Sequence, residues 1–189
     1  MKKTAIILGF LVLLNGCTFA DELNDKINVL YAENNIKDAF QLLLSIPEEE
    51  RTTQNWLLLG NILQDEGKPD EAIFMYNSAI AKDEKDYKAH YNLGNAYLAN
   101  EQPNMAILEF KKVVKYKPDF AYGYYNLGCA YLKVGKIRQA KWEFFKAIDI
   151  NNNVADFHYN LAYTFKQLGN EKQAKIYLDY YNKLMEIGQ

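Results

Sequence analysis

Small and large apolar residues recur along most of the chain at an interval of 34 residues. One series pairs a leucine with a small residue, at Leu59-Gly60, Leu93-Gly94, Leu127-Gly128 and Leu161-Ala162. A second series joins an alanine to a large residue four positions later, at Ala72/Tyr76, Ala106/Phe110, Ala140/Phe144 and Ala174/Leu178. Spacings of three or four residues place such side chains on one stripe of an α-helix. The pattern therefore predicts four units of two helices each, over 53–86, 87–120, 121–154 and 155–189.

Glycine and proline mark where the two helices of a unit separate. Gly67, Gly135 and Gly169 fall at one step of the repeat, where a residue in the left-handed conformation ends a helix. Pro69 and Pro103 follow, at the start of the second helix, where a missing N–H is tolerated. The glycine of each Leu-Gly step has a different purpose, because it lets the paired helices approach closely and seat the large Tyr or Phe beside it.

A weaker unit precedes these four, over 23–52. Leu23, Ile27 and Leu30 form a helical stripe, and the segment 35–43 resembles the second half of the repeat. The unit has no Leu-Gly step, and Pro47 predicts an early end to its second helix. We interpret it as a degenerate repeat that caps the array, because terminal repeats are atypical by necessity.

The motif His90-x-x-Leu93-Gly94-x-x-Tyr97, continued by Ala106-x-x-x-Phe110 and Pro118, resembles the tetratricopeptide repeat. The resemblance implies an all-α, right-handed solenoid of about five helix–turn–helix pairs, the first degenerate. In such repeats the first helices line an inner groove that binds peptides. The groove residues that the resemblance implies here are Asn61, Tyr91, Asn95, Tyr122, Tyr125, Cys129, Tyr159 and Tyr163.

Three of these tyrosines, Tyr91, Tyr125 and Tyr159, recur at the 34-residue interval, and each precedes an asparagine. Tyrosine combines an apolar ring with a hydrogen-bonding tip and is favoured where proteins recognise proteins. We expect the tyrosines to contact a bound partner, with plain helix packing as the alternative. For Asn92, Asn126 and Asn160 we favour a structural role, in stabilising the helix hairpins.

Composition narrows the class of protein. The chain has 189 residues, of which 49% are hydrophobic and 24% charged, so it is expected to fold. Its net charge of −2 argues against nucleic-acid binding through phosphate neutralisation. Aromatic residues make up 14% of the chain, and 15 of them are tyrosines, more than the repeat motif itself requires.

Candidate catalytic and metal-binding residues are few. His90 and His158 share the repeat position of Trp56 and Tyr124, which indicates packing, and two repeats separate them. Stacked helices lie about 8–10 Å apart, so the two imidazoles cannot share one metal ion. Cys129 has no base at a matching position and is interpreted as a small apolar filler. We predict no enzymatic activity, no metal and no cofactor.

The N-terminus predicts an export signal. Lys2 and Lys3 precede an apolar stretch over 4–14, too short for a bilayer core that needs roughly 20 helical residues. Leu14-Asn15-Gly16-Cys17 resembles the lipobox of bacterial lipoproteins, which implies removal of 1–16, lipidation of Cys17 and a short tether over 17–22. Thr18 after the cysteine then favours the outer membrane, facing the periplasm. The alternative is ordinary cleavage after Ala20, which yields a soluble periplasmic or secreted protein.

Together these features predict a membrane-tethered scaffold or adaptor that binds protein partners or peptide segments of the bacterial cell envelope. Two alternatives stay open: a pilotin-type lipoprotein for type IV pilus assembly, and a regulatory adaptor of a cell-wall hydrolase or other envelope enzyme. We expect the last helix to leave an apolar end of the array partly open at Tyr177, Tyr180 and Tyr181, and a homodimer through this helix is a further expectation.

Overall fold

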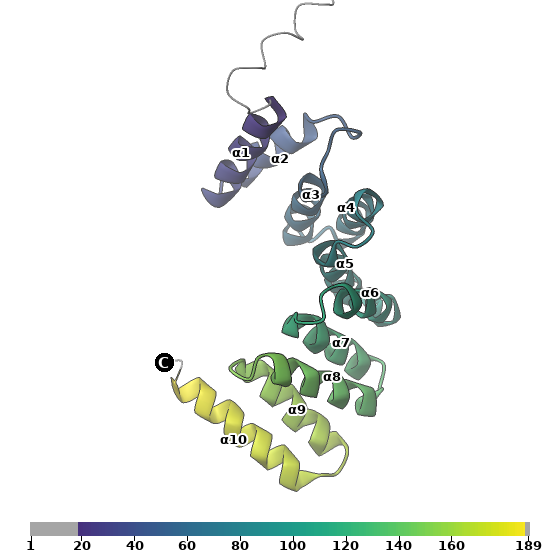
Figure 1. Cartoon of the computed structure of the whole chain (residues 1–189), viewed down its shortest axis with the longest axis vertical. Coiled ribbons are helices and arrows are strands. Elements are labelled where there is room, and N and C mark those ends of the chain that lie inside the picture. The colour runs from purple at the N-terminus through teal and green to yellow at the C-terminus, as the bar shows by residue number, and fades with distance from the viewer. Residues whose placement is uncertain (1–18, 188–189) are drawn as a thin grey trace, which may run out of the picture.

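A computed structural model describes residues 19–187, and every regular element in that range is an α-helix (Figure 1). The ten helices, in chain order, are α1 (Phe19–Ala32), α2 (Ile36–Leu44), α3 (Thr53–Asp65), α4 (Pro69–Lys82), α5 (Tyr87–Ala99), α6 (Pro103–Tyr116), α7 (Ala121–Lys133), α8 (Ile137–Ile150), α9 (Ala155–Gln167) and α10 (Glu171–Ile187). They form five antiparallel pairs, which confirms the predicted helical solenoid.

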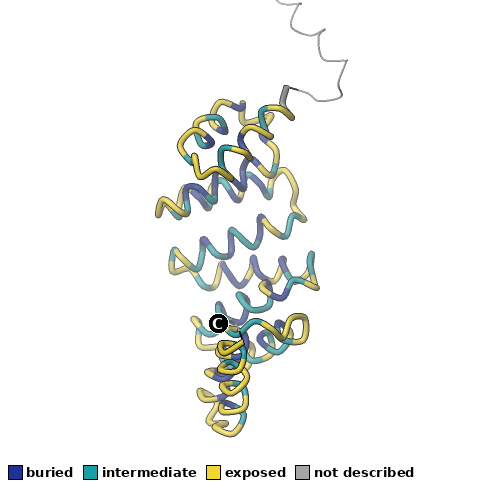
Figure 2. Tube along the Cα trace, turned by 90° about the vertical axis from the view of Figure 1, so that its left-hand side faces the viewer, coloured by how far each residue is buried: buried dark blue, intermediate teal, exposed yellow. Residues whose placement is uncertain are grey.

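The pairs stack in chain order into an arc (Figure 1). Helices α4, α6 and α8 each pack against the first helix of their own pair and against the first helix of the next pair. The first pair, α1–α2, packs less extensively on α3 than the later pairs pack on one another. Buried residues form a band along the stacked helices, while turns and outward faces are exposed (Figure 2).

The turns inside the helix pairs share one backbone conformation, a residue with a positive φ angle. Gly67, Gly135 and Gly169 have φ angles of 74°, 74° and 73°, as the spacing predicts. Asn34 and Glu101 adopt the same left-handed conformation without being glycine, with φ of 60° and 54°. Pro69 and Pro103 occupy the first turns of α4 and α6, also as expected.

In the three middle pairs a glycine of the first helix packs closely against an aromatic ring of the second helix. A Cβ atom at Gly60 would lie 2.4 Å from the Tyr76 ring. At Gly94 and Gly128 the same atom would lie 2.6 Å from the ring of Phe110 or Phe144. Real Cβ contacts are never this short, so the aromatic side chain and the glycine require each other.

The N-terminal pair differs from its expected bounds. Helix α1 already begins at Phe19, so part of the segment 17–22 that was expected to be a tether is helical. Asp21 and Glu22 favour this start, because carboxylates stabilise the N-terminal end of a helix. The predicted leader over 1–16 and Cys17 lie outside the described residues. No helix between residues 19 and 187 is long and apolar enough to cross a membrane.

Candidate protein-binding face

Polar side chains link successive first helices. Asn92 of α5 donates a hydrogen bond to Asn61 of α3, with an N···O distance of 2.9 Å. Asn126 of α7 donates in the same way to Asn95 of α5 at 2.7 Å. These asparagines therefore join neighbouring repeats, whereas a role within each helix hairpin was expected from the sequence.

The chain of amides changes at the next step, where Cys129 stands at the position of Asn61 and Asn95. Asn160 of α9 donates to the hydroxyl oxygen of Tyr125 on α7 at 2.8 Å. Tyr125 thus replaces the missing asparagine as the acceptor. Burial raises the pKa of the Cys129 thiol to about 11, and a thiol that stays protonated at neutral pH is a poor nucleophile.

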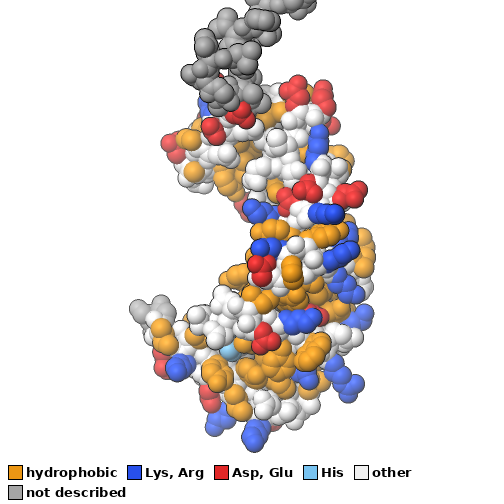
Figure 3. Space-filling model, in the orientation of Figure 1, with side chains coloured by type: hydrophobic (Ala, Val, Ile, Leu, Met, Phe, Trp, Pro, Cys, Tyr) orange, Lys and Arg blue, Asp and Glu red, His pale blue; other side chains and the backbone are white. Residues whose placement is uncertain are grey.

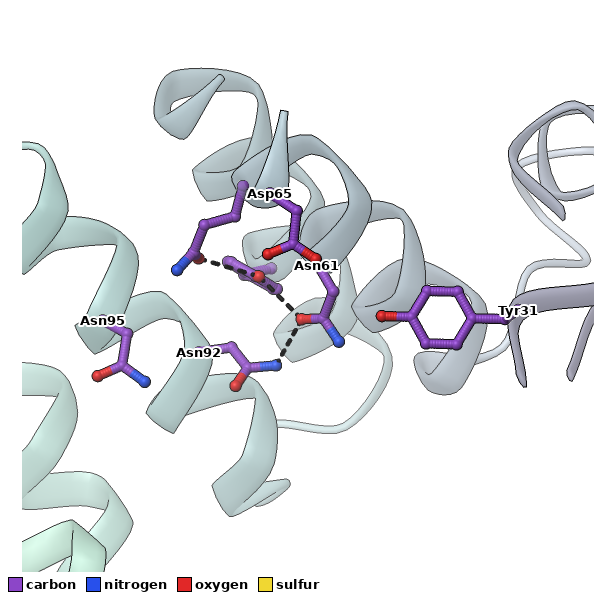
Figure 4. A pocket seen from close by; sticks show the side chains of 7 residues that line it. Tyr31, Asn61, Asp65, Asn92 and Asn95 are labelled. Carbon is purple, nitrogen blue, oxygen red and sulfur yellow. Dashed lines mark hydrogen bonds between the residues drawn. The ribbon is translucent and has the colours of Figure 1, made fainter. Parts of the chain in front are cut away.

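The first of these links lies in a polar pocket near the N-terminal end of the array (Figure 4). The Tyr76 hydroxyl donates to Asn61 at 2.9 Å and lies 3.1 Å from the Gln64 carbonyl oxygen. Burial raises the pKa of Tyr76 and keeps this donor protonated. Asn61 is thus held by Tyr76 and Asn92, which makes it part of the internal structure. The other residues that line the pocket are Tyr31, Asp65 and Asn95.

Two of the predicted groove tyrosines are packing residues in part. The Tyr91 ring lies 6.0 Å from Phe110 and 5.2 Å from Phe120, measured between centroids. Tyr125 lies 5.8 Å from Phe144 and 4.8 Å from Phe157. Both side chains are half-buried, and burial raises the pKa of each phenol.

Tyr122, Tyr159 and Tyr163 are exposed, and we call these three residues the tyrosine face. Tyr122 meets Phe157 edge to face at 5.3 Å, and Tyr159 lies 5.2 Å from Tyr181. Tyr159 and Tyr163 also line one shallow pocket between α9 and α10, beside Lys166 and Leu178. The exposed members of the predicted groove therefore lie on α7 and α9, where Tyr159 and Tyr163 share one pocket, whereas Asn61 lies on α3.

A buried contact between a histidine and a carboxylate lies outside this face and was not foreseen. His90 Nδ1 lies 2.7 Å from the Glu109 carboxylate, and Nε2 lies 3.0 Å from the Glu84 carbonyl oxygen. Burial alone would raise the pKa of Glu109, but hydrogen bonds from His90 and Lys112 outweigh burial and lower it.

His158 occupies the matching position in the last pair and has different neighbours. Its Nε2 donates to the Asn152 carbonyl oxygen at 2.8 Å, and its ring stacks on Tyr177 and Tyr180. Between residues 19 and 187, no group of three or more His, Cys, Asp or Glu side chains is arranged to hold a metal ion.

A regular set of exposed apolar residues on the second helices was also not foreseen: Phe74, Leu108, Trp142 and Ile176. The signal was present, because these residues recur at the same 34-residue interval as the core positions. The apolar residue type at this position does not by itself indicate that the side chain faces outward.

The fold and the tyrosine face define an all-helical repeat protein, a class that binds partners along extended curved surfaces. Three tetratricopeptide-repeat models match the chain, over 63–124, 109–141 and 155–187, which together span more than half of it. The chain belongs to the tetratricopeptide-repeat family. No curated protein matches it.

Solved structures of MamA proteins have a similar fold. The "MamA RS-1 ArsTM double mutant" superposes with a TM-score of 0.83 at 19% identity, over 90% of this chain and 96% of that one. "MamA 41-end from Desulfovibrio magneticus RS-1" gives 0.78 at 20% identity, over 89% and 94%. "MamA MSR-1 C2" gives 0.75 at 21% identity, over 88% and 97%. At this level of identity the likeness concerns the fold.

Proposed function

We propose that this protein is a non-enzymatic scaffold or adaptor that binds a protein segment on its tyrosine face. The observation that carries the proposal is the exposure of Tyr122, Tyr159 and Tyr163 on first helices whose other aromatic residues are packed. Exposed tyrosine offers a large, rigid contact area at low entropic cost, and its hydroxyl can bond to a partner's backbone. The partner class is therefore a protein segment with apolar side chains.

The proposal extends to the cell envelope through the predicted lipid anchor at Cys17. With α1 beginning at Phe19, an acyl group on Cys17 would hold the first helix pair close to a bilayer. A partner would then be a protein of the envelope, most simply at the outer membrane. Mass spectrometry of the mature N-terminus tests this part, with a diacylated or triacylated Cys17 expected. An unmodified mature chain that begins at Asp21 would contradict it.

A site-specific photo-crosslinker tests the binding face in living cells. The crosslinking amino acid replaces Tyr163 in one variant and Phe74 in the matched control, because both positions are exposed but lie on opposite helices of their pairs. We expect a discrete protein adduct from position 163 and none of the same mass from position 74. Equal adducts from both positions, or an adduct from position 74 alone, would refute the tyrosine face as the binding site.

A further inference from the structure

The four exposed apolar residues of the second helices form a regular row, which we call the outer ladder. Phe74, Leu108, Trp142 and Ile176 occupy the same position in α4, α6, α8 and α10, with exposed fractions of 61%, 52%, 64% and 38%. The second helices α4 and α6 lie on the outer side of the arc, away from its hollow (Figure 1). Single exposed apolar residues are common, but the same position left apolar and exposed in four successive repeats makes this row a candidate contact surface.

The charged residues beside this row differ in sign between α4 and the next two second helices, α6 and α8. Around Phe74, α4 carries Asp70 and Glu71 in its first turn. The outer sides of α6 and α8 are basic instead, with exposed Lys111, Lys112, Lys115, Arg138 and Lys146. Figure 3 shows Lys and Arg side chains along the convex right-hand edge, beside exposed apolar ones.

The acidic residues of α6 and α8 do little to offset this positive charge. Glu109 and Glu143 lie largely inside, where they pair with Lys112 and Lys146. Asp149 is the one exposed carboxylate on the two helices. Within residues 19–187, Lys111 and Arg138 form no ion pair, although Lys111 interacts at longer range with Glu143 and opposes the rise in its pKa.

We propose that the outer sides of α6 and α8, centred on Leu108 and Trp142, bind the surface of a membrane that contains anionic lipids. Helices that combine exposed Trp and Leu with Lys and Arg lie in the headgroup region, where apolar side chains insert and basic ones meet phosphate. Long lysine side chains can reach the headgroups while their methylene stems stay near apolar atoms.

Shape favours a membrane over a folded protein as the occupant. A convex arc touches a plane along a short stretch only, and the basic residues beside Leu108 and Trp142 lie on two neighbouring second helices. Trp142 projects from this surface and meets Phe145 edge to face at a centroid distance of 6.5 Å. A projecting ring needs a surface that can yield around it, which the headgroup layer provides. The inference does not depend on the tyrosine face, which lies on the first helices.

The fluorescence of Trp142 provides a direct test. The chain has two tryptophans, and Trp56 is buried, so a change in emission on adding vesicles reports on Trp142. The sample is the chain from residue 17 onward with Cys17→Ser, which keeps every described residue and removes the acyl and leader contributions. The probes are vesicles of phosphatidylcholine alone and of phosphatidylcholine mixed with phosphatidylglycerol.

We expect Trp142 emission to move to shorter wavelength with the anionic vesicles, to stay unchanged with the neutral ones, and to revert in high salt. Trp142→Ser should lower vesicle binding in sedimentation by about tenfold. Lys111→Gln should lower it by about fivefold. Phe74→Ser is the matched control and should have little effect, because Phe74 lies beside acidic residues.

Three results would overturn the proposal: no emission shift with anionic vesicles, an equal shift with neutral vesicles, or an equal loss from Phe74→Ser. A further contradiction would be a Trp142→Ser variant that binds vesicles normally but loses a crosslinked protein, because the outer ladder would then serve a protein partner. Circular dichroism of each variant confirms that the helices are intact, and since Trp142 is exposed, we expect its replacement to leave the fold unchanged.

Discussion

The three middle helix pairs and the last pair pack the same positions with different residues. In the middle pairs a glycine of the first helix faces Tyr76, Phe110 or Phe144, and these rings are almost fully buried. In the last pair the glycine is replaced by Ala162 and the aromatic residue by Leu178, which is 41% exposed. The two positions change together. An aromatic ring at the second position occupies the space where the Cβ atom of an alanine would lie, so it fits beside glycine but not beside alanine.

The difference also shows what buries a side chain in such an array. A large residue at this position is covered on one side by its own first helix and on the other by the first helix of the next pair. No described helix follows α10, so Leu178 keeps one side open, and Tyr159 and Tyr163 beside it are exposed as well. Packing and binding surface are therefore set by position in the array as much as by residue type.

The largest expected change in stability comes from comparing a buried large residue, Phe110, with its partly exposed counterpart in the last pair, Leu178. Phe110→Ala should lower the free energy of unfolding by about 3–5 kcal/mol, because it leaves a cavity between α5, α6 and α7. Leu178→Ala should cost about 1 kcal/mol, since much of that side chain already contacts water. Urea unfolding followed by circular dichroism measures both, and similar losses would mean that the two positions are equally buried.

The glycine positions give the next contrast. Gly94→Ala should destabilise the protein by about 1–3 kcal/mol, because the new Cβ atom would press on the Phe110 ring. Ala162→Gly should cost about 1 kcal/mol through lost helix propensity alone. The double variant Gly94→Ala/Phe110→Leu reproduces the alanine and leucine of the last pair. Its loss of unfolding free energy should be smaller than the sum of the losses from the two single changes. Strict additivity would show that the contact between residues 94 and 110 is not the source of the strain.

Two carboxylates at one repeat position should respond to pH in opposite ways. Interactions with His90 and Lys112 lower the pKa of Glu109 below its ordinary value of 4.5, so its stabilising effect is present above that value and is lost as pH falls. Burial raises the pKa of Glu143, so its ionisation costs stability as pH rises above 4.5. Glu109→Gln should therefore destabilise by about 1–2 kcal/mol at neutral pH, while Glu143→Gln should stabilise by less than about 1 kcal/mol.

Thermal melts of the two variants across pH 3–8 check these signs. The gap between wild type and Glu109→Gln should narrow as pH falls through the lowered pKa. The gap between wild type and Glu143→Gln should vanish at low pH, where both states hold the proton. The same slope for both variants would contradict the assignment of opposite pKa shifts.

The smallest effect concerns the turns. Glu101 has a positive φ at the step where Gly67, Gly135 and Gly169 stand, and a residue with a Cβ is strained there. Glu101→Gly should stabilise the protein by about 0.5–1 kcal/mol, and Gly135→Ala should destabilise it by about 1 kcal/mol. Chemical denaturation resolves both changes, and a loss of stability in Glu101→Gly would refute strain at this turn.

The repeat period made the fold predictable from the sequence. Leu-Gly steps, turn glycines and prolines each follow a local rule, so the helix pairs and their turns could be expected without coordinates. The start of α1 was less predictable, because Phe19 and Ala20 lie at the edge of a segment with features of an export signal. The pairing of Asn92 with Asn61 also needed the structure, since the bond joins repeats and not neighbours in sequence.

The candidate site was predictable only in outline. Tyr91 and Tyr159 share one repeat position, but the first is half-buried against Phe110 and Phe120 and the second is exposed. The period identifies equivalent positions, whereas exposure depends on which side chains the neighbouring repeat contributes. For the same reason Trp142 was not distinguished from core aromatics, although its position recurs regularly.

We expect the tyrosine face to bind a partner while the buried aromatic residues hold the array together. The most direct measurement compares the melting temperature and partner crosslinking of Tyr159→Ser/Tyr163→Ser with those of Tyr125→Ser. We predict that the double variant melts close to the wild-type temperature but loses the crosslinked partner. Tyr125→Ser should instead lower the melting temperature, because Asn160 loses the phenol oxygen that accepts its hydrogen bond. Phe144 and Phe157 also lose an aromatic packing neighbour. A double variant that keeps its partner, or that loses it only by unfolding, would contradict the claim.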